Sequence, residues 1–467
     1  MISRRSLFLT PALALGAPSR EAQHESRLGA SFRRAPRNGW TFVHLEGKPN
    51  EIGFQHGYWL AKEIAAAHRV VAFEMEHDTE KPWTFYRDAV KEYFWPKVDA
   101  EYREEMEGIA GGVQARGGKL DVWDIAAFNA WLEWSPYFLN WYQSRKRQSG
   151  PSLAVADRCS AFVATGSYTK DGNIVMGHNA WTGYANGSHW SIIFDINPSH
   201  GHRFIMDGYP GLIHSGDDFG INAAGISITE TTITQFDGFD PDGIPEFVRA
   251  RKAMQYSASI DDFARIMKTG NNGGYANNWL VADRKTREIA SLELGLKNVT
   301  LQRTFDGYYV GSNFPVNEKL IREETKFDAD DKSLSPNARR IRWEQLMKEY
   351  KGRIDVAAGQ RFLADHVDSF TGKDDANERS LCGHNELSPR GMKPWQPEFG
   401  AAGAVQNKVT DAAMAARLAL TASFGHACGR HFKAAAFLRK HPQFAYLKPY
   451  LRDLNSHPWT AFEAARS

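Results

Sequence analysis

The amino-acid sequence predicts a large layered domain of the α+β class. Three observations predict it. Apolar residues recur at helical spacing over residues 50–146, short apolar runs bounded by Gly, Asn and Asp follow Pro151, and helical spacing returns after residue 337. Because long blocks of helix and strand succeed one another, with no internal repeat and no low-complexity linker, we expect one layered domain rather than several small ones.

Composition narrows the classes of function. The chain has 467 residues, with 57 Lys and Arg against 55 Asp and Glu, and 42% hydrophobic residues. These proportions exclude a disordered chain, a collagen and a disulfide-dense miniprotein. A net charge of +2 argues against a nucleic-acid partner or an acidic membrane surface. The 14 Trp and 28 Phe indicate extensive core packing or a groove for an apolar ligand.

The first residues are expected to be a targeting segment rather than part of the fold. Arg4 and Arg5 precede an apolar run over 7–17, which is shorter than the roughly 20 residues that span a bilayer. This pattern predicts a signal peptide over residues 1–22, and the paired arginines fit the twin-arginine type. We therefore expect a bacterial periplasmic or secreted protein. No later stretch is long and apolar enough for stable membrane insertion.

The first block is expected to be largely helical. Apolar positions at helical spacing occupy 51–74 and 100–113, and the second run stops before Gly117 and Gly118. The third candidate helix, 121–142, is unusually aromatic and could shape a substrate groove.

The second block is expected to form antiparallel strands. The predicted strands are 160–165, 173–177, 190–196, 203–206, 225–231, 279–282, 288–294 and 307–311. A helical block at 246–268 interrupts them, and Ser259 resembles an N-cap for its second half. Further helices are predicted at 337–350, 356–367 and 411–420.

The three cysteines are Cys159, Cys382 and Cys428, an odd number for an exported protein. If Cys382 and Cys428 pair, Cys159 is left over. A lone thiol in an oxidising compartment is either buried and inert or kept for chemistry. Cys159 begins a predicted strand, and a small buried cysteine at a strand start is the simple interpretation.

A chemical interpretation of Cys159 starts from the bond that precedes it. If the chain is cut between Arg158 and Cys159, the new α-amine lies beside the thiol. An α-amine has a pKa of about 7.7–8.0, so it can act as the general base for its own side chain. The thiol can make the cut itself by attacking the Arg158 carbonyl to give a thioester, which water then releases.

Seven segments carry a resemblance to a known family. In order, they are EIGFQHG (51–57), GHNAW (177–181), YPGLIHSGDDFGINAAGISITETTI (209–233), GGYANNWLVAD (273–283), YYVGSNFP (308–315), SPNARRIRW (335–343) and SLCGH (380–384). Together they resemble the phospholipase B-like family of N-terminal-nucleophile hydrolases and, more distantly, penicillin acyltransferase-like and bile-salt-hydrolase-like proteins. The resemblance covers residue 40 to the C-terminus.

The resemblance implies a fold and a division of the chain. The fold is an αββα sandwich of two antiparallel sheets between helical layers. Residues 23–158 would form an N-terminal chain or propeptide, and 159–467 the catalytic chain. After cleavage the two fragments would remain associated.

The resemblance also implies roles for single residues. Cys159 matches the nucleophile, and Asn313 matches the asparagine that lines the oxyanion hole. His178 and Trp181 match pocket residues that face the nucleophile; bile-salt-hydrolase-like proteins have Arg and Asp there, which favours the phospholipase B-like branch. The alternatives are a turn residue for Asn313, a structural histidine for His178 and a packed aromatic for Trp181.

Other polar residues are assigned in the same way. Thr231 matches an active-site threonine, and its neighbour Thr232 should face the other side of the strand. Asn222 resembles a second polar residue near the oxyanion, or else a turn residue. Asn277, with Asn278, could pin the sheet beside the pocket.

Arg339 resembles an arginine that supports the nucleophile loop or neutralises a carboxylate, although Arg340 and Arg342 compete for that assignment. Helical spacing alone does not decide among the three.

No metal and no cofactor are expected. Asp217 and Asp218 lack a histidine pair at ligand spacing, and the resemblance requires neither. In the family, a second cysteine soon after the SLC motif closes a small bridge. Here His384 and Asn385 occupy that stretch, so Cys428 is the remaining partner for Cys382 besides the nucleophile.

Three functions stay open. The first is a phospholipase B-like hydrolase of lipid acyl esters. The second is an amidase or acyltransferase that cleaves N-acyl small molecules. The third is a processed but catalytically weak lipid-binding protein, in which replacement of Cys159 would change no turnover.

Overall fold

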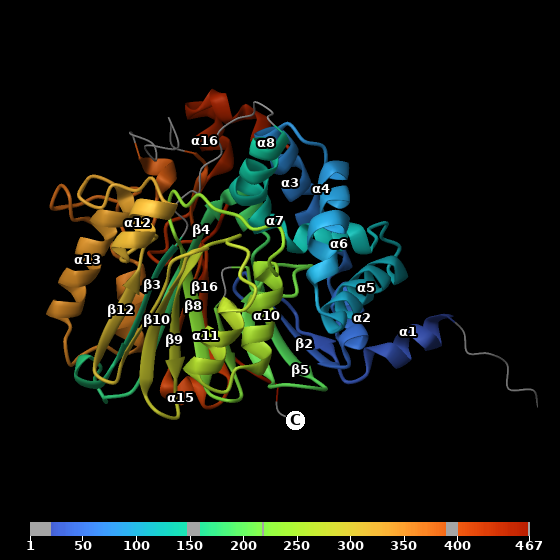
Figure 1. The fold of residues 1–467 in the computed structure, drawn as a ribbon, viewed down its shortest axis with the longest axis horizontal. Coiled ribbons are helices and arrows are strands. Elements are labelled where there is room, and N and C mark those ends of the chain that lie inside the picture. Colours follow the sequence, from blue (N-terminus) through green and yellow to red (C-terminus); the bar gives the residue numbers. More distant parts are fainter. Residues whose placement is uncertain (1–19, 147–158, 217–218, 389–399, 466–467) are drawn as a thin grey trace, which may run out of the picture.

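A computed structural model describes residues 20–146, 159–216, 219–388 and 400–465. Two β-sheets lie between layers of helices, and Figure 1 shows α13 outside the strands on one side and the N-terminal helices on the other. The α+β class and the αββα arrangement are confirmed. The predicted signal peptide lies almost wholly outside the described residues.

The larger sheet has nine strands in the order β1-β2-β5-β6-β7-β8-β9-β10-β11. All neighbours are antiparallel except β2 and β5, which are parallel. The strands are β1 (Phe32–Arg33), β2 (Thr41–Gly47), β5 (Ile192–Pro198), β6 (Phe204–Gly208), β7 (Gly220–Asn222), β8 (Ile226–Thr232), β9 (Asn277–Asp283), β10 (Glu288–Leu294) and β11 (Val299–Thr304).

The smaller sheet has six antiparallel strands in the order β12-β3-β4-β15-β16-β17. They are β12 (Gly307–Gly311), β3 (Cys159–Thr165), β4 (Val175–Gly183), β15 (Ala402–Asp411), β16 (Ala419–Phe424) and β17 (Thr460–Glu463). A separate pair is formed by β13 (Val367–Asp368) and β14 (Lys373–Asp374).

The two sheets share one apolar core. Ala161 and Val163 of β3 pack in the same cluster as Leu280 and Ala282 of β9. Side chains alternate between the faces of a strand, so the odd-numbered residues of β3 point toward the other sheet. This alternation defines which polar side chains face the gap between the sheets.

Helices cover the outer faces. α13 (Ser335–Glu349) and α14 (Val356–Leu363) pack on the smaller sheet through Trp343 and Phe362, and α10 (Glu246–Tyr256) and α11 (Ile260–Lys268) pack on the larger. The remaining α-helices are α1 (Arg20–Leu28), α2 (Pro49–Trp59), α3 (Ala61–Thr79), α4 (Trp83–Ala89), α5 (Ala100–Ala115), α6 (Val122–Asn129), α7 (Trp131–Glu133), α8 (Leu139–Lys146), α9 (Tyr184–Gly187), α12 (Glu318–Glu324), α15 (Ala412–Ala415) and α16 (Ala434–Lys440).

The N-terminal segment does more than form a helical layer, because β1 and β2 extend the larger sheet. Its helices α2 and α5 cross in close contact through glycines. A Cβ atom on Gly53 would lie 1.9 Å from the Glu105 carbonyl oxygen, and one on Gly57 would lie 2.0 Å from that of Ile109. The two backbones therefore meet only because these positions lack a side chain.

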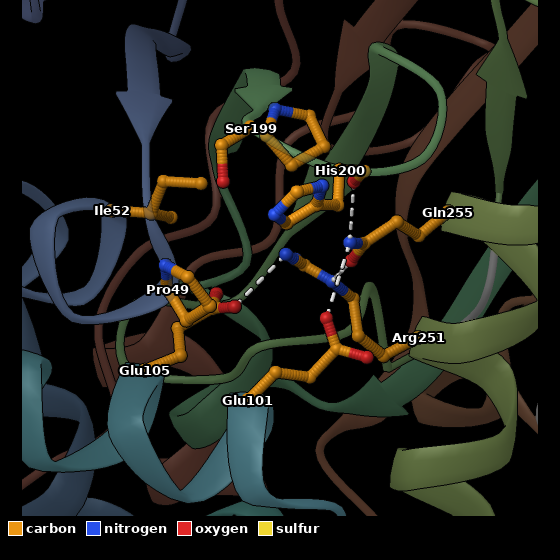
Figure 2. A pocket seen from close by; sticks show the side chains of 9 residues that line it. Pro49, Ile52, Glu101, Glu105, Ser199, His200, Arg251 and Gln255 are labelled. Carbon is orange, nitrogen blue, oxygen red and sulfur yellow. Dashed lines mark hydrogen bonds and ion pairs between the residues drawn. The ribbon is translucent and has the colours of Figure 1, made fainter.

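A buried ion pair joins this segment to α10. Arg251 lies 2.9 Å from Glu105, both side chains are at most 2% exposed, and Figure 2 shows them converging with Gln255 on a small cavity. Burial raises the pKa of Glu105 to about 7, and Arg251 opposes that shift. The pair ties α5 to the strand-containing part of the chain.

The aromatic stretch 121–142 forms core rather than surface. Phe128, Trp134 and Phe138 are fully buried, and Trp134 meets Phe138 edge-on at 5.2 Å. Within this stretch the rings therefore stabilise the N-terminal helices.

The predicted helix over 411–420 is wrong. That stretch holds a single helical turn, α15, which joins β15 to β16. The run of alanines favours helix, but Asp411 ends β15 and Ala419 and Leu420 begin β16, so only Ala412–Ala415 is helical. By contrast, Ser259 caps α11 as predicted, accepting a hydrogen bond from the Asp262 N–H at 3.1 Å.

No helix in the described ranges is both long and apolar enough to cross a membrane.

Candidate active site

Cys159 is the first described residue of β3, and it is 1% exposed. It pairs with Ala180 of β4, and by alternation its side chain points toward the larger sheet, as those of Ala161 and Val163 do. The residues on its N-terminal side, including Arg158, lie outside the described residues. The thiol thus stands at one end of the gap between the two sheets.

Asn313 connects Cys159 to the opposite sheet. Its Oδ1 accepts a hydrogen bond from the Cys159 N–H at 3.4 Å, and its Nδ2 donates to the Thr232 carbonyl oxygen at 2.9 Å. The residue is buried and has a φ of 71°, in the left-handed region. Asn occupies this region more readily than most residues, and such strain is found at sites where geometry matters.

Arg339 of α13 fixes the orientation of both residues. Its Nη1 donates to the Cys159 carbonyl oxygen at 2.5 Å, and its Nη2 donates to Asn313 Oδ1 at 3.0 Å. A guanidinium can only donate, so the oxygen of the Asn313 amide must face Arg339 and the nitrogen must face Thr232. The same amide oxygen also accepts the hydrogen bond from the Cys159 N–H.

The three arginines of this helix differ in what they contact. Arg342 forms an ion pair with Asp365 at 2.6 Å, and Arg340 lies 4.0 Å from Glu344. Of the three, Arg339 reaches Cys159. Its Nε also donates to Ser335 Oγ at 3.0 Å.

Trp181 lies beneath Arg339. The guanidinium carbon is 4.2 Å from the centre of the indole ring, and Trp181 Nε1 donates to Asn179 Oδ1 at 3.0 Å. Asn179 also receives the Ser160 N–H at 3.0 Å. By alternation Trp181 is on the α13 face of the sheet, so it lies on the opposite side of the sheet from the Cys159 thiol, in contact with Arg339.

His178 of β4 and Thr231 of β8 both face the gap between the sheets, as Cys159 does. His178 is fully buried and pairs with Ala161. The Thr231 hydroxyl lies 2.5 Å from where a Cβ on Gly311 would stand, and Gly311 neighbours β3. Thr232 points the other way and bonds Tyr275 at 3.2 Å, so Thr231 is the threonine that faces the gap.

Asn222 is the last residue of β7, where the chain turns into β8. Its Nδ2 donates to the carbonyl oxygens of Met254 (3.0 Å) and Ser257 (2.8 Å), and its Oδ1 accepts from the Ile226 N–H at 3.0 Å. These bonds hold the end of α10 against the turn, and the structure does not bring Asn222 to Cys159.

Asn277 pairs with Thr232, on the face of β9 that turns away from the smaller sheet. Its amide is buried without a hydrogen-bond partner among the described residues. Its neighbour Asn278 faces the gap and accepts from Ser291 at 2.7 Å. Substrate-binding roles for Asn222, Asn277 and Trp181 stay predictions.

A buried ion pair that the sequence did not reveal crosses between the sheets beside His178. Lys408 of β15 pairs with His178 in register, and its Nζ lies 3.5 Å from Asp207 of β6. Gln406 and Ser215 also bond Asp207, at 2.7 and 2.9 Å. The gap therefore holds fixed charges as well as apolar side chains.

A second cluster carries metal-binding chemistry. Ligand atoms of His366, Cys382, His384 and Cys428 all lie within 4.8 Å of one another. Both cysteines are unbonded thiols, so they form no disulfide in this structure. The sequence predicted no metal site, and it gave little signal because these residues come from three separated segments. Asp217 and Asp218, considered from the sequence, lie outside the described residues.

Comparison with known proteins identifies relatives. The profile of the phospholipase B family matches residues 66–313, just over half of the chain. The match includes Cys159 and Asn313 and ends before Arg339.

Three relatives illustrate the sequence identity and coverage of these matches. An uncharacterized protein of Archaeoglobus fulgidus is 26% identical over 54% of this chain and 42% of its own length. Putative phospholipase B-like 2 of Caenorhabditis elegans is 32% identical over 53% of this chain and 48% of its own. Phospholipase B-like 1 of Homo sapiens is 24% identical over 52% and 48%. The chain spans about half the length of the curated relatives it matches.

Proposed function

This chain belongs to the phospholipase B family, and we propose that it is an acyl hydrolase whose nucleophile is the thiol of Cys159, freed by cleavage of the Arg158–Cys159 bond. The observation that carries the proposal is the convergence of Arg339 and Asn313 on the backbone of Cys159. A structural cysteine at a strand start would need neither a buried guanidinium nor a left-handed asparagine at its N–H.

The chain would make its own cut. The Cys159 thiol gives up its proton and attacks the Arg158 carbonyl carbon, and the bond from that carbon to the Cys159 nitrogen breaks as the nitrogen takes a proton. The product is a thioester with a free α-amine. Water then hydrolyses the thioester, leaving a carboxylate on Arg158 and a thiol on Cys159.

After the cut, the α-amine would serve as the general base. Asn313 Oδ1 is already placed to hold the nitrogen of Cys159. The positive charge of Arg339, which bonds the same oxygen, disfavours a second positive charge on the amine and so lowers the pKa of the amine. A neutral amine can then accept the thiol proton near neutral pH.

Asn313 would also stabilise the oxyanion. Its Nδ2 is turned away from Arg339 and toward Thr232, at the end of the gap where the thiol stands. A fixed amide donor at a developing oxyanion commonly contributes about 10²–10³ in rate. Because Cys159 is buried in the uncut chain, we expect turnover only after cleavage.

The two fragments would stay together. Strand β2, which precedes the cut, is hydrogen-bonded along its length to β5, which follows it. The buried pair of Glu105 and Arg251 joins the same two parts. Separating them would expose a sheet edge and two buried charges, which is unfavourable.

The substrate that we propose is a lipid acyl ester, since the named relatives are called phospholipase B-like. Export to the periplasm or the medium remains part of the proposal and rests on the twin-arginine pattern. No nucleic-acid partner is proposed.

Turnover by the purified, cleaved protein tests the proposal. A glycerophospholipid and an N-acyl amide with the same acyl chain are compared, with Cys159→Ala as the control, and released fatty acid is measured. Release from the phospholipid by the wild type alone is the expected result. Release from the amide alone would favour the amidase function. Acyl binding that is unchanged in Cys159→Ala, without turnover, would favour a lipid-binding protein.

A further inference from the structure

We infer that His366, Cys382, His384 and Cys428 form a structural zinc site that supports the loop behind the active site. The four residues supply two sulfurs and two imidazole nitrogens, a donor set that proteins use for tetrahedral Zn²⁺. They converge although they come from three segments: the residue before β13, the turn over 380–384, and the loop after β16.

The separations fit a shared metal. With Zn–S of about 2.3 Å and Zn–N of about 2.0–2.1 Å, neighbouring ligand atoms of a tetrahedron lie about 3.3–3.8 Å apart. His384 Nε2 lies 3.5 Å from Cys428 Sγ, and all four ligand atoms lie within 4.8 Å of one another. A contraction of less than about 1.5 Å would bring every ligand to bonding distance from one centre.

The surroundings of His384 resemble the outer shell of a metal site. Its Nδ1 faces Glu386 Oε1 at 3.0 Å, which leaves Nε2 directed at the cluster. The Tyr184 hydroxyl donates to Glu386 Oε2 at 2.6 Å and lies 3.0 Å from His426 Nε2. A carboxylate that holds the far nitrogen of a ligand histidine fixes its tautomer and its orientation.

Backbone hydrogen bonds also position the two cysteines of the cluster. The Arg430 N–H donates to Cys428 Sγ at 3.4 Å, a contact that favours a thiolate. The Cys382 N–H donates to the Asp365 carbonyl oxygen at 3.0 Å, which holds the cysteine beside the segment of His366. His366 Nε2 is buried and has no hydrogen-bond partner among the described residues.

Two other interpretations of the cluster are less consistent with it. Cys428, His384 and Glu386 alone would form a thiol–imidazole–carboxylate relay. However, Cys382 and His366 crowd the same thiol, where a substrate carbonyl would have to enter. A Cys382–Cys428 disulfide would leave both imidazoles without a role.

The site is in contact with the proposed catalytic apparatus. Gly383, between Cys382 and His384, has a φ of 65°, and a Cβ there would lie 2.2 Å from Trp181. Trp181 in turn supports Arg339. A metal that fixes the turn would therefore hold the ring on which the guanidinium rests, which is a positioning role.

Metal analysis of the full chain, purified without chelators or a metal-affinity tag, tests this inference. We expect about one zinc per chain in the wild type and in Cys159→Ala, which is the matched cysteine control. Cys382→Ser and Cys428→Ser should lose it. Cobalt(II) added to the chelator-stripped wild type should give visible tetrahedral bands and a thiolate-to-cobalt charge-transfer band, a readout that requires no variant to fold.

Three outcomes would overturn the inference. The first is a wild type that contains no metal and gives no cobalt spectrum. The second is an intact mass lower by two hydrogens with Cys382 and Cys428 protected from alkylation, which would show a disulfide. The third is a metal-free Cys428 that is alkylated rapidly in a His384-dependent manner, which would show a reactive relay. None of these readouts depends on acyl turnover.

Discussion

Arg339 Nη1 donates a hydrogen bond to the carbonyl oxygen of Cys159 at 2.5 Å, from a helix that follows β3 by more than a third of the chain. The guanidinium is fully buried, and it bonds Asn313 as well. A buried charge is costly unless its donors are satisfied, and the donors of Arg339 are satisfied by Cys159 and Asn313. In our account, these bonds fix the N-terminus of the catalytic chain.

Arg339→Lys is expected to slow self-cleavage at Cys159 by at least about tenfold. The single ammonium group of lysine cannot bond Cys159 and Asn313 at the same time, as the forked guanidinium does. Each hydrogen bond from a charged group that the variant loses is worth about 1.5–3 kcal/mol. The rate is measured as the appearance of the smaller fragment on gels. Arg340→Lys is the matched control and should cleave normally, because its guanidinium is partly exposed and lies away from Cys159.

Asn313 has two features that can be tested separately: its left-handed backbone and its side-chain amide. We expect Asn313→Gly and Asn313→Ala both to reduce turnover about 10²–10³-fold, because both lack the amide donor. Only the alanine variant should lose stability relative to glycine, by about 1–2 kcal/mol, because its Cβ is unfavourable at a φ of 71°. Turnover and urea unfolding are measured for each. Full turnover in the glycine variant would contradict the oxyanion role.

The crossing of α2 and α5 gives a stability prediction. Gly57→Ala should destabilise the chain by about 1–3 kcal/mol, because the new Cβ would lie 2.0 Å from a backbone oxygen. Gly111→Ala, on the partner helix α5, is the control. Its Cβ would meet Phe54 at 3.9 Å, an ordinary contact, and alanine favours helix over glycine by about 0.5–1 kcal/mol. Urea midpoints in a Cys159→Ala background should move in opposite directions.

His56 predicts a pH dependence. Burial lowers the pKa of His56 to about 3, and its Nε2 accepts the Gly211 N–H at 2.9 Å. Between about pH 6.5 and pH 3, His56 is therefore protonated in the unfolded chain and neutral in the folded chain. The contribution of His56 to stability is present above that pH and is lost as the pH falls toward 3.

His56→Gln keeps an acceptor but does not titrate. The free energy of unfolding, measured from pH 7 to 4, should fall less steeply in the variant than in the wild type. Glu105 acts in the opposite sense, since its pKa is raised to about 7 and its contribution falls as the pH rises through that value. Because Glu105 is present in both proteins, the difference between them isolates His56. Parallel curves would show that His56 is not buried as a neutral ring.

The sequence predicted those elements whose residues follow a simple period. β10 was expected at 288–294 and is Glu288–Leu294, since its apolar residues stand between clear turn signals. β15 was missed because its interior positions include Lys408 and Gln406, whose partner Asp207 belongs to the other sheet. Burial of a polar residue depends on a tertiary partner, which a local pattern does not contain.

The site was predictable in part for the same reason. Asn313 and Cys159 were identified by resemblance, and the structure brings them together. The choice of Arg339 over its neighbours required the position of α13 against β3. Trp181 was expected to face the nucleophile, yet one residue of register places it on the other face of β4, beneath Arg339.

Intact mass and N-terminal sequencing of the purified protein, beside Cys159→Ala, test the central claim most directly. The account predicts a wild-type fragment whose first residue is Cys159, still bound to its N-terminal partner, and an uncut Cys159→Ala chain. A wild-type chain that stays uncut after long incubation at mildly acidic pH, while it hydrolyses acyl substrate as fast as Cys159→Ala does, would contradict it.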